Sequence, residues 1–408
     1  MTKKRLLAML AALLVLGGCL AAFSALGESL LSCRGTVTIS REEYDYLLSL
    51  EKYDKLDEVL QYIEAMYYKE PDEEQMLDYA IQGMLAALED PYTFYYDEDN
   101  WDAHQEDESG EYYGIGIQLL GNYEEMTVTI TRVFKDTPAL AAGLRKGDII
   151  VRVDDLEVNT ESMQAAVDIM RGEVGGTVEV EVYRNGEYLT FKVTRAPIRI
   201  NYVDYMMLDQ DVGYVALYQF STAALISDFN KAMDTLEQQG AKSIILDLRD
   251  NPGGWVDDAV NVADRFLDHK LVVYSATRFE ERTDERYTQK GADDIPLILL
   301  VNGNSASSSE ILSGALKDYG RATLVGTQTF GKGIMQYVFP LSDEVTGMQF
   351  TVCEYFTPLG NSVHGIGIAP DIEVELPEEL EGALLELGDM SDLQLQAAWE
   401  AAVKAQEQ

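Results

Sequence analysis

The sequence predicts an α+β multidomain protein in which a helical segment, a β-rich domain and an α/β domain follow one another. Apolar residues recur at helical spacing from residue 41 to about residue 87. Short apolar runs separated by glycine follow between residues 113 and 197, which is typical of short strands. Predicted strands and helices then alternate between residues 200 and 374, and this alternation favours α/β packing.

These changes of pattern divide the chain into five expected segments. In chain order they are a signal or membrane anchor over 1–27, a helical segment over 35–105, a β-rich domain over 106–197, an α/β domain over 198–375, and an acidic tail with one helix over 376–408.

Composition narrows the classes of partner. The 408 residues include 71 acidic and 31 basic side chains, which gives a formal net charge of -40. Such a charge repels phosphate backbones, so we expect no nucleic-acid partner and interpret the acidic side chains as a solvated surface. The three cysteines show no C-x-x-C spacing, so the sequence indicates neither a metal site nor a redox pair, and we expect no cofactor.

The N-terminus has the pattern of an export signal. Lys3, Lys4 and Arg5 precede a mainly apolar run from Leu6 to Leu26. The run is also long enough to span a bilayer, which needs roughly 20 residues. Three outcomes stay open: an uncleaved anchor, a lipoprotein attached through Cys19 (since Leu16-Gly17-Gly18-Cys19 resembles a bacterial lipobox), or a cleaved signal. Each places the body of the protein outside the cytoplasm, at the bacterial cell membrane for the first two.

Particular elements can be placed within the first two folded segments. Pro71 is expected to open a helix, because proline is favoured at the first helical position. Thr160 is expected to cap a helix that ends at Met170. Asn185-Gly186 separates two apolar runs and predicts a β-hairpin.

The α/β domain is expected to contain buried strands, of which Leu297 to Val301 is purely apolar. The other expected strands are 213–217, 243–248 and 323–326, and the expected helices are 226–238, 255–267 and 308–319, with a further helix at 392–405 in the tail.

A run of small residues, Asn302 to Glu310, follows one of these strands and precedes a helix. A serine there stands near helix N-terminal amide groups that can receive an oxyanion. The alternative is simple capping: Ser305 or Ser307 caps the helix, and Ser307 with Glu310 has the spacing of a capping box.

A serine nucleophile needs a base, and histidine is a poor candidate here. The chain holds only His104, His269 and His364, and no G-x-S-x-G motif accompanies them, so we do not expect a Ser-His-Asp triad. Lys332 lies between two glycines amid apolar neighbours, where burial would lower its pKa towards a value suited to a base. The alternative is an ordinary exposed turn.

A third motif, Asp247-Leu248-Arg249-Asp250-Asn251-Pro252-Gly253-Gly254-Trp255, also joins a buried strand to a helix. Its glycines can present backbone N–H groups to a ligand, or they can simply allow a tight turn; both interpretations are compatible.

Together these motifs resemble the carboxyl-terminal processing peptidases, also called tail-specific proteases, over residues 41–374. The matching motifs are D-L-R-x-N-P-G-G, S-A-S-x-S-E, F-G-K-G and a closing G-I-x-P-D. The resemblance implies a crotonase-like (ClpP-like) protease core in which Ser307 is the nucleophile, Lys332 the general base and Gln336 the residue that orients the lysine. It further implies oxyanion donors at the backbone amides of Gly253 and Ser308.

The β-rich domain resembles a PDZ domain. The resemblance makes Gly114, Ile115, Gly116 and Ile117 the loop that binds a peptide carboxylate. PDZ domains add a peptide as an extra strand, which fits recognition of protein C-termini. The glycine pattern does not continue as G-x-G-x-x-G, so a nucleotide site is not indicated.

The resemblance implies a serine endopeptidase that cleaves exported or membrane proteins near accessible C-termini, with homo-oligomerisation through the helical segment as a further possibility. Two alternatives remain. A non-catalytic PDZ scaffold is disfavoured because Ser307, Lys332 and Gln336 are all present. A lipid-binding protein on the same fold is disfavoured because such proteins lack a PDZ domain.

Overall fold

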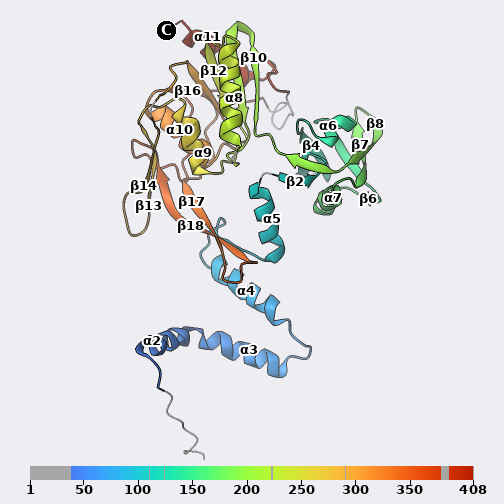
Figure 1. Cartoon of the computed structure of the whole chain (residues 1–408), viewed down its shortest axis with the longest axis vertical. Coiled ribbons are helices and arrows are strands. Elements are labelled where there is room, and N and C mark those ends of the chain that lie inside the picture. The colour runs from blue at the N-terminus through green and yellow to red at the C-terminus, as the bar shows by residue number, and fades with distance from the viewer. Residues whose placement is uncertain are drawn as a thin grey trace, which may run out of the picture. The chain divides into compact units, whose positions relative to one another are not determined.

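The computed structural model describes residues 38–109, 111–123, 125–221, 224–289, 291–377 and 386–407 (Figure 1). Its contacts divide the chain into two units, one ending at Leu77 and one beginning at Asp78. The predicted anchor over residues 1–27 lies outside the described residues. Within the described ranges, no helix is both long and apolar enough to cross a membrane.

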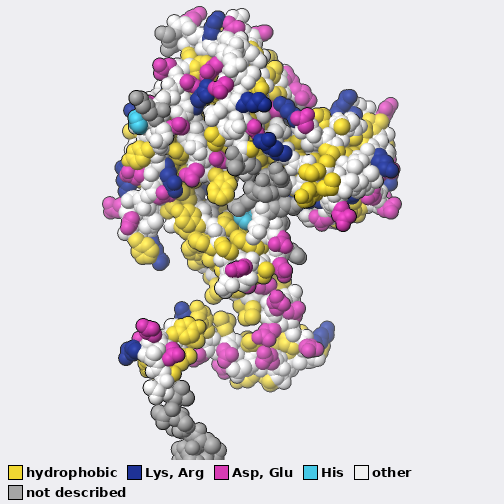
Figure 2. Space-filling view, in the orientation of Figure 1, with side chains coloured by type: hydrophobic (Ala, Val, Ile, Leu, Met, Phe, Trp, Pro, Cys, Tyr) yellow, Lys and Arg dark blue, Asp and Glu magenta, His cyan; other side chains and the backbone are white. Residues whose placement is uncertain are grey.

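The first unit is helical, as predicted. It contains α2 (Arg41–Leu50), the 3₁₀ turn η1 (Glu51–Tyr53), α3 (Asp54–Met66) and the beginning of α4 (Glu73–Ala86). Ser40 caps α2: its hydroxyl accepts from Glu43 N–H at 3.0 Å, and the Glu43 carboxylate accepts from Ser40 N–H at 2.7 Å. Such a reciprocal pair satisfies two amide groups of the first turn. Neither α2 nor α3 contains a buried residue, and Figure 2 shows hydrophobic and acidic side chains side by side on this unit.

The β-rich domain contains an antiparallel sheet in the order β3-β4-β5-β7-β8, with β6 paired to β5. Its elements are β3 (Ile117–Asn122), β4 (Thr127–Val133), α6 (Pro138–Ala142), β5 (Ile149–Val153), β6 (Leu156–Glu157), α7 (Met163–Met170), β7 (Thr177–Arg184) and β8 (Glu187–Thr194). A separate pair joins β2 (Glu111–Gly114) to β9 (Ala196–Arg199). Alternating valines of β7 form a core of their own with Ile130 of β4, Leu144 and Met170.

The predicted hairpin at Asn185-Gly186 is confirmed, whereas the predicted start of helix α7 is wrong. Asn185 and Gly186 both have positive φ, 51° and 90°, as a two-residue type I′ turn requires. Helix α7 begins at Met163 with Ser162 as N-cap, not after Thr160. The side chain of Asn159 accepts from the N–H groups of Glu161 and Ser162. This local turn competes with the helix and delays its start.

The α/β domain is built on a six-stranded sheet in the order β10-β11-β12-β15-β16-β19, in which only β10 and β11 are antiparallel. Its elements are β10 (Val203–Leu208), η2 (Asp209–Asp211), β11 (Val212–Leu217), α8 (Leu225–Gln238), β12 (Ser243–Asp247), α9 (Val256–Asp264), β15 (Leu297–Val301), α10 (Ser308–Asp318), β16 (Ala322–Gly326) and β19 (Ile372–Glu373). Every residue of β11, β12 and β15 is buried, as expected of strands covered on both faces.

The two faces of this sheet are covered by different helices (Figure 1). Helices α8, α9 and α10 pack on one face in a large apolar core. Helix α11 (Leu393–Ala405) packs on the other, where Leu395, Ala398 and Ala402 meet β11, β12 and β15. This helix, predicted in a separate acidic tail, is instead a layer of the α/β domain, because its alanine and leucine stripe covers an otherwise exposed sheet face.

A second sheet has the order β1-β18-β13-β14, with β17 also paired to β18. Its strands are β1 (Phe94–Tyr96), β13 (Leu271–Ala276), β14 (Thr283–Tyr287), β17 (Ile334–Pro340) and β18 (Gly347–Phe356), and α5 (Glu98–Ser109) follows β1. Strand β1 precedes the β-rich domain in the chain, yet Phe94 pairs with Gln349 of β18. A short piece of the predicted helical segment therefore belongs to the sheet that also contains Gln336.

Candidate active site

Ser307 differs from its neighbours in the serine run. The hydroxyls of Ser305, Ser308 and Ser309 each donate to a backbone carbonyl, those of Leu248, Gly254 and Asn251 at 2.7–2.9 Å. These three serines thus tie the run to the glycine turn that follows β12, which is a structural role.

Ser307 itself is half-buried and is the N-cap of α10. Its backbone has φ 54° and ψ −116°, a combination that costs free energy for a residue with a side chain. Strain of this kind persists where surrounding contacts impose it, and it often occurs at catalytic residues. The capping interpretation is also partly right, since Ser307 N–H donates to the Glu310 carboxylate at 2.9 Å.

Glu310 joins the serine to the lysine loop. It is fully buried on the first turn of α10, and its carboxylate accepts from Ser307 N–H and from Lys332 N–H, both at 2.9 Å. The same carboxylate accepts from Gly331 N–H at 2.7 Å and from the Thr329 hydroxyl at 2.6 Å. A buried charge needs such partners, and here the partners come from the two segments that carry the predicted dyad.

Tyr355 of β18 makes a second link between the same two residues. Its buried hydroxyl lies 2.6 Å from the carbonyl oxygen of Lys332 and 3.1 Å from that of Ser307, and its single proton is shared between them. The backbones of Ser307 and Lys332 are therefore held together on two sides by independent side chains.

The glycines around Lys332 are required by packing. A Cβ on Gly333 would lie 2.2 Å from the backbone nitrogen of His364, and Gly331 has φ +89°. The loop from His364 to Gly367 packs directly on this segment, and Gly365 N–H donates to Gly331 at 2.9 Å. The closing motif of the sequence therefore supports the lysine loop, which is packed and not an exposed turn.

The environment of Lys332 lowers the pKa of its ammonium group. Desolvation by burial is the main cause, and the carboxylates of Asp90 and Glu310 oppose it. The direction is the one that a general base needs.

Gln336 lies on β17, four residues after the lysine. Its side-chain amide donates to the Thr351 hydroxyl of β18 at 3.1 Å. In this structure the Gln336 side chain therefore contacts Thr351. This hydrogen bond does not show the predicted role of orienting Lys332.

The glycine turn after β12 closely approaches the serine. A Cβ on Gly253, which has φ +98°, would lie 2.7 Å from Ser307 Cβ and 2.8 Å from Ser308 N. Ser308 begins α10, so its N–H belongs to the first turn, whose amides have no partner within the helix. The two predicted oxyanion donors thus lie in adjacent backbone segments.

The Gly253 amide, however, is occupied: it donates to the side-chain oxygen of Asn251 at 2.9 Å. Asn251 is completely buried, and its own side-chain N–H₂ donates to Leu217 at 2.8 Å. In this structure the carboxamide of Asn251 therefore stands where an oxyanion would have to compete for the Gly253 donor.

Sequence reasoning missed several residues of this site. Glu310 entered only as a capping partner, and Tyr355 and Asn251 were given no role. The capping-box spacing was a signal for Glu310. No local pattern singles out Tyr355, because its hydroxyl contacts residues 48 and 23 positions away in the sequence.

The predicted peptide loop connects β2 to β3. Gly114 ends β2, Ile117 begins β3, and the side chain of Ile115 is buried in the domain core. Gly116 has φ +89°, and a Cβ there would lie 2.5 Å from Thr137. The loop is thus packed on the start of α6, while β3 is an edge strand of its sheet, to which an extended peptide can add.

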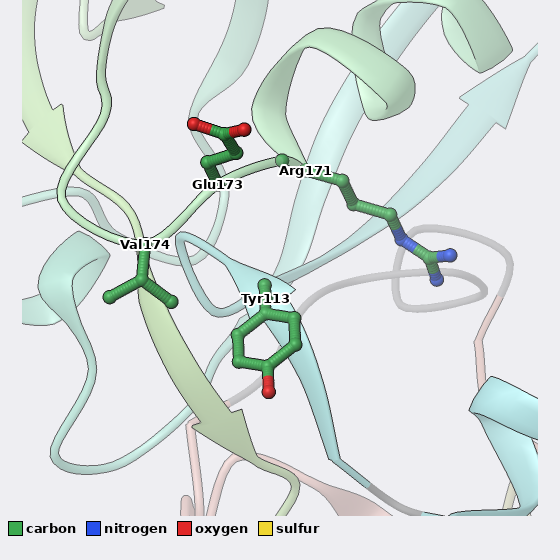
Figure 3. Close-up of a pocket in the computed structure, with 5 residues that line it drawn as sticks. Tyr113, Arg171, Glu173 and Val174 are labelled. Atoms are coloured by element: carbon green, nitrogen blue, oxygen red, sulfur yellow. The ribbon is translucent and has the colours of Figure 1, made fainter.

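A pocket of about 410 Å³ lies beside this loop, lined by Tyr113, Arg171, Gly172, Glu173 and Val174. Figure 3 shows that Arg171 and Glu173 project in different directions from the segment that follows α7, with the ring of Tyr113 below them. The pocket combines an aromatic ring with one cationic and one acidic side chain, next in sequence to the predicted loop.

Comparison with known proteins gives a consistent result. Residues 211–374 match the model of peptidase family S41, residues 114–194 that of the PDZ domain, and residues 26–100 that of the activating protease CtpB N-terminal domain. The chain is 35% identical to the carboxy-terminal-processing protease of Bartonella bacilliformis, over 89% of this chain and 84% of that protein. It is 39% identical to the carboxyl-terminal-processing protease of a Picosynechococcus species, over 78% and 77%.

A solved structure, that of the photosystem II D1 C-terminal processing protease, superposes with a TM-score of 0.52 at 30% identity, and the match covers 87% of this chain and 99% of that one. The resemblance noted from the motifs is therefore confirmed, and so is the mixed α+β architecture. The chain belongs to the carboxyl-terminal-processing proteases, peptidase family S41, and carries their PDZ domain.

Proposed function

We propose that this protein is a serine-type endopeptidase with Ser307 as nucleophile and Lys332 as general base. The observation that carries the proposal is the pair of bridges, from Glu310 and from Tyr355, between the backbones of these two residues. A nucleophile and a base must be held within reach of each other, and these bridges provide the fixed frame.

In the proposed mechanism the neutral amine of Lys332 removes the proton of the Ser307 hydroxyl while the oxygen attacks the scissile carbonyl. The protonated lysine then donates its proton to the leaving amine as the peptide bond breaks. Water attacks the resulting acyl ester, with Lys332 again accepting a proton, and this step releases the new C-terminus and regenerates the serine.

The backbone amides of Ser308 and Gly253 are the proposed oxyanion donors. Because the Gly253 amide is bonded to Asn251, the proposal includes an exchange: the developing oxyanion replaces the Asn251 oxygen as acceptor. Gln336 is proposed to orient the lysine once substrate is bound, moving from its contact with Thr351.

The proposed substrates are proteins or peptides with accessible C-termini. The loop of Gly114, Ile115, Gly116 and Ile117 would receive the terminal carboxylate, and the free edge of β3 would pair with the preceding residues. A chain bound there would then be cut near its end at Ser307.

The N-terminal sequence supports a location outside the cytoplasm, with the protein held at the bacterial membrane by its apolar segment. The first unit supports a homo-oligomer, since α2 and α3 expose Tyr46, Leu47, Leu56 and Val59 and bury none of their residues. Light scattering of the chain with and without residues 41–66 tests the second point.

The central test is proteolysis of labelled casein by the wild-type chain and by Ser307→Ala and Lys332→Ala. Both variants should lose cleavage while keeping the wild-type unfolding temperature to within a few degrees. Lys231→Ala, an exposed lysine on α8, is the matched control and should cleave normally. Full activity of either dyad variant would refute the assignment, and a wild-type chain that binds peptides without cutting them would favour the scaffold function instead.

A further inference from the structure

The ring of Tyr92 lies against the proposed general base. Lys332 Nζ is 4.4 Å from the centroid of that ring, which is the geometry of a cation–π contact. Tyr92 precedes the PDZ domain in the chain, whereas the match to the protease family begins only at residue 211. A side chain from the region that matches the CtpB N-terminal domain, and not from the region that matches peptidase family S41, thus lies against the proposed base.

The turn that carries Tyr92 is rigidly built. The carboxylate of Asp90 accepts from Tyr92 N–H at 2.9 Å and from the Thr93 hydroxyl at 2.7 Å. The turn is also docked on β18: the Tyr92 carbonyl accepts from the Gln349 side chain at 3.0 Å, and the Thr93 hydroxyl accepts from Thr351 N–H at 3.0 Å. The position of the ring is therefore set by both the turn and the sheet.

The contacts of this turn also connect it to Gln336, another residue of the predicted site. Thr351, which donates to Thr93, accepts from Gln336 through its hydroxyl. The turn of Tyr92 and Thr93 is thus connected through Thr351 to Gln336, and β1, which begins at Phe94, adds its own pairing to β18.

We propose that Tyr92 is a positioning residue that holds the Lys332 amine in place, so that the active site is completed by the segment before the PDZ domain. The proposal rests on the Ser307/Lys332 dyad proposed above. A lysine side chain has a flexible four-carbon stem, and the face of an aromatic ring restricts its end without competing for the proton.

The groups around the Lys332 amine determine in which direction its pKa should change when Tyr92 is replaced. The charged groups that act on the Lys332 amine are the carboxylates of Asp90 and Glu310, and His364 acts in turn on Asp90. Burial acts to raise the pKa of Asp90, but hydrogen bonds from Thr351, Thr93 and Tyr92 outweigh it and keep that pKa low, so the carboxylate remains charged.

The ring of Tyr92 also favours the ammonium form, through its negative face. Leucine would keep an apolar cover over Lys332 but remove this face. The pKa of Lys332 should then fall further below the ordinary value of lysine, and phenylalanine should leave it nearly unchanged.

The experiment uses the full chain, with cleavage of labelled casein followed as a function of pH. For Tyr92→Leu we expect kcat to fall about tenfold with KM unchanged, and the acid limb of the profile to move down by about 0.5 to 1 pH unit. For Tyr92→Phe both should stay close to wild type. A Tyr92→Leu profile with its acid limb in the wild-type position would overturn the proposal.

A second measurement does not depend on activity. In a Ser307→Ala background, labelling of Lys332 by acetic anhydride, read by mass spectrometry across pH, reports when the amine becomes neutral. The midpoint should move down in Tyr92→Leu and stay in Tyr92→Phe; equal midpoints would contradict the inference. If the leucine variant does not fold, Tyr92→Met serves in its place.

The two proposals fail separately. If proteolysis persists in Lys332→Ala, the proposed Ser307/Lys332 dyad is refuted. Labelling of Lys332 would still test its contact with Tyr92. If cleavage requires Lys332 but the midpoint of Lys332 labelling is the same in wild type and Tyr92→Leu, only the proposed role of Tyr92 is refuted.

Discussion

Gly253 approaches Ser307 so closely that a Cβ atom on residue 253 would lie 2.7 Å from Ser307 Cβ. Since Gly253 also has φ +98°, both the space and the backbone conformation require glycine there. The turn after β12 therefore packs directly against the start of α10.

Gly253→Ala should therefore abolish casein cleavage, because the added methyl group must push the turn away from Ser307 and Ser308. We expect a loss of more than about 100-fold, the size seen when an oxyanion donor is removed. Gly303→Ala is the matched control: it lies on the same serine loop, with its nearest neighbouring atom at 3.9 Å and no positive φ. Near-normal cleavage by Gly253→Ala would show that this turn takes no part in catalysis.

Glu310→Gln should both destabilise the protein and inactivate it. The variant keeps the shape of the side chain but replaces one acceptor oxygen by a donor N–H₂, which then faces N–H groups. The expected loss in the free energy of unfolding is about 2–4 kcal/mol, measured by urea titration. Glu281→Gln, on an exposed loop, should change stability by less than about 0.5 kcal/mol. Equal stabilities of the two variants would mean that the Glu310 bridges contribute nothing.

Lys332→Met should remove activity and increase stability at neutral pH. The pKa of Lys332 is lowered in the folded chain, so the unfolded chain binds more protons between that value and the ordinary 10.5. Lys332 therefore does not lower the free energy of unfolding above its ordinary pKa of 10.5. Below that pH it lowers the free energy of unfolding increasingly, until the pH has fallen through the lowered pKa of the folded chain. The advantage of the methionine variant should shrink as pH rises towards 10.5, and an advantage that grows with pH would contradict the direction of the shift.

Asp148→Ala should destabilise the PDZ domain. Asp148 is 1% exposed and holds Arg184, which is 16% exposed, through two bonds of 2.5 and 2.6 Å. Removing one partner leaves the other charge buried and unpaired, which costs about 3–5 kcal/mol. Lys242→Ala breaks the exposed pair with Asp211 and should cost less than about 1 kcal/mol. Thermal unfolding of both variants makes the comparison; similar shifts would argue that the Asp148 pair is effectively solvated.

Much of the fold could be predicted because its signals are local. The strand Leu297–Val301 was predicted to the residue, since a short run of purely apolar residues between loops allows little else. The start of α7 was missed because the side chain of Asn159 decides it, and two competing local hydrogen bonds leave no periodic trace.

The candidate site divides in the same way. Ser307 and Lys332 could be singled out because each stands in a short local motif, and their roles were assigned from the resemblance of the combined motifs to a known family. The roles of Tyr355 and Tyr92 could not be predicted, because they depend on β18 pairing with β17 and with β1, strands far apart in the sequence. Nothing near either tyrosine indicates the partner that it meets.

Helix α11 has a consequence for how the protein is made. It is the last of the described elements in chain order, yet it covers the central strands β11, β12 and β15. Domains assemble during synthesis from the N-terminal end, at about 5–20 residues per second. The PDZ domain can therefore fold while the chain is still growing, whereas the protease sheet keeps one apolar face uncovered until helix α11 has been synthesised. A nascent chain thus lacks a complete core for this sheet until helix α11 has been synthesised.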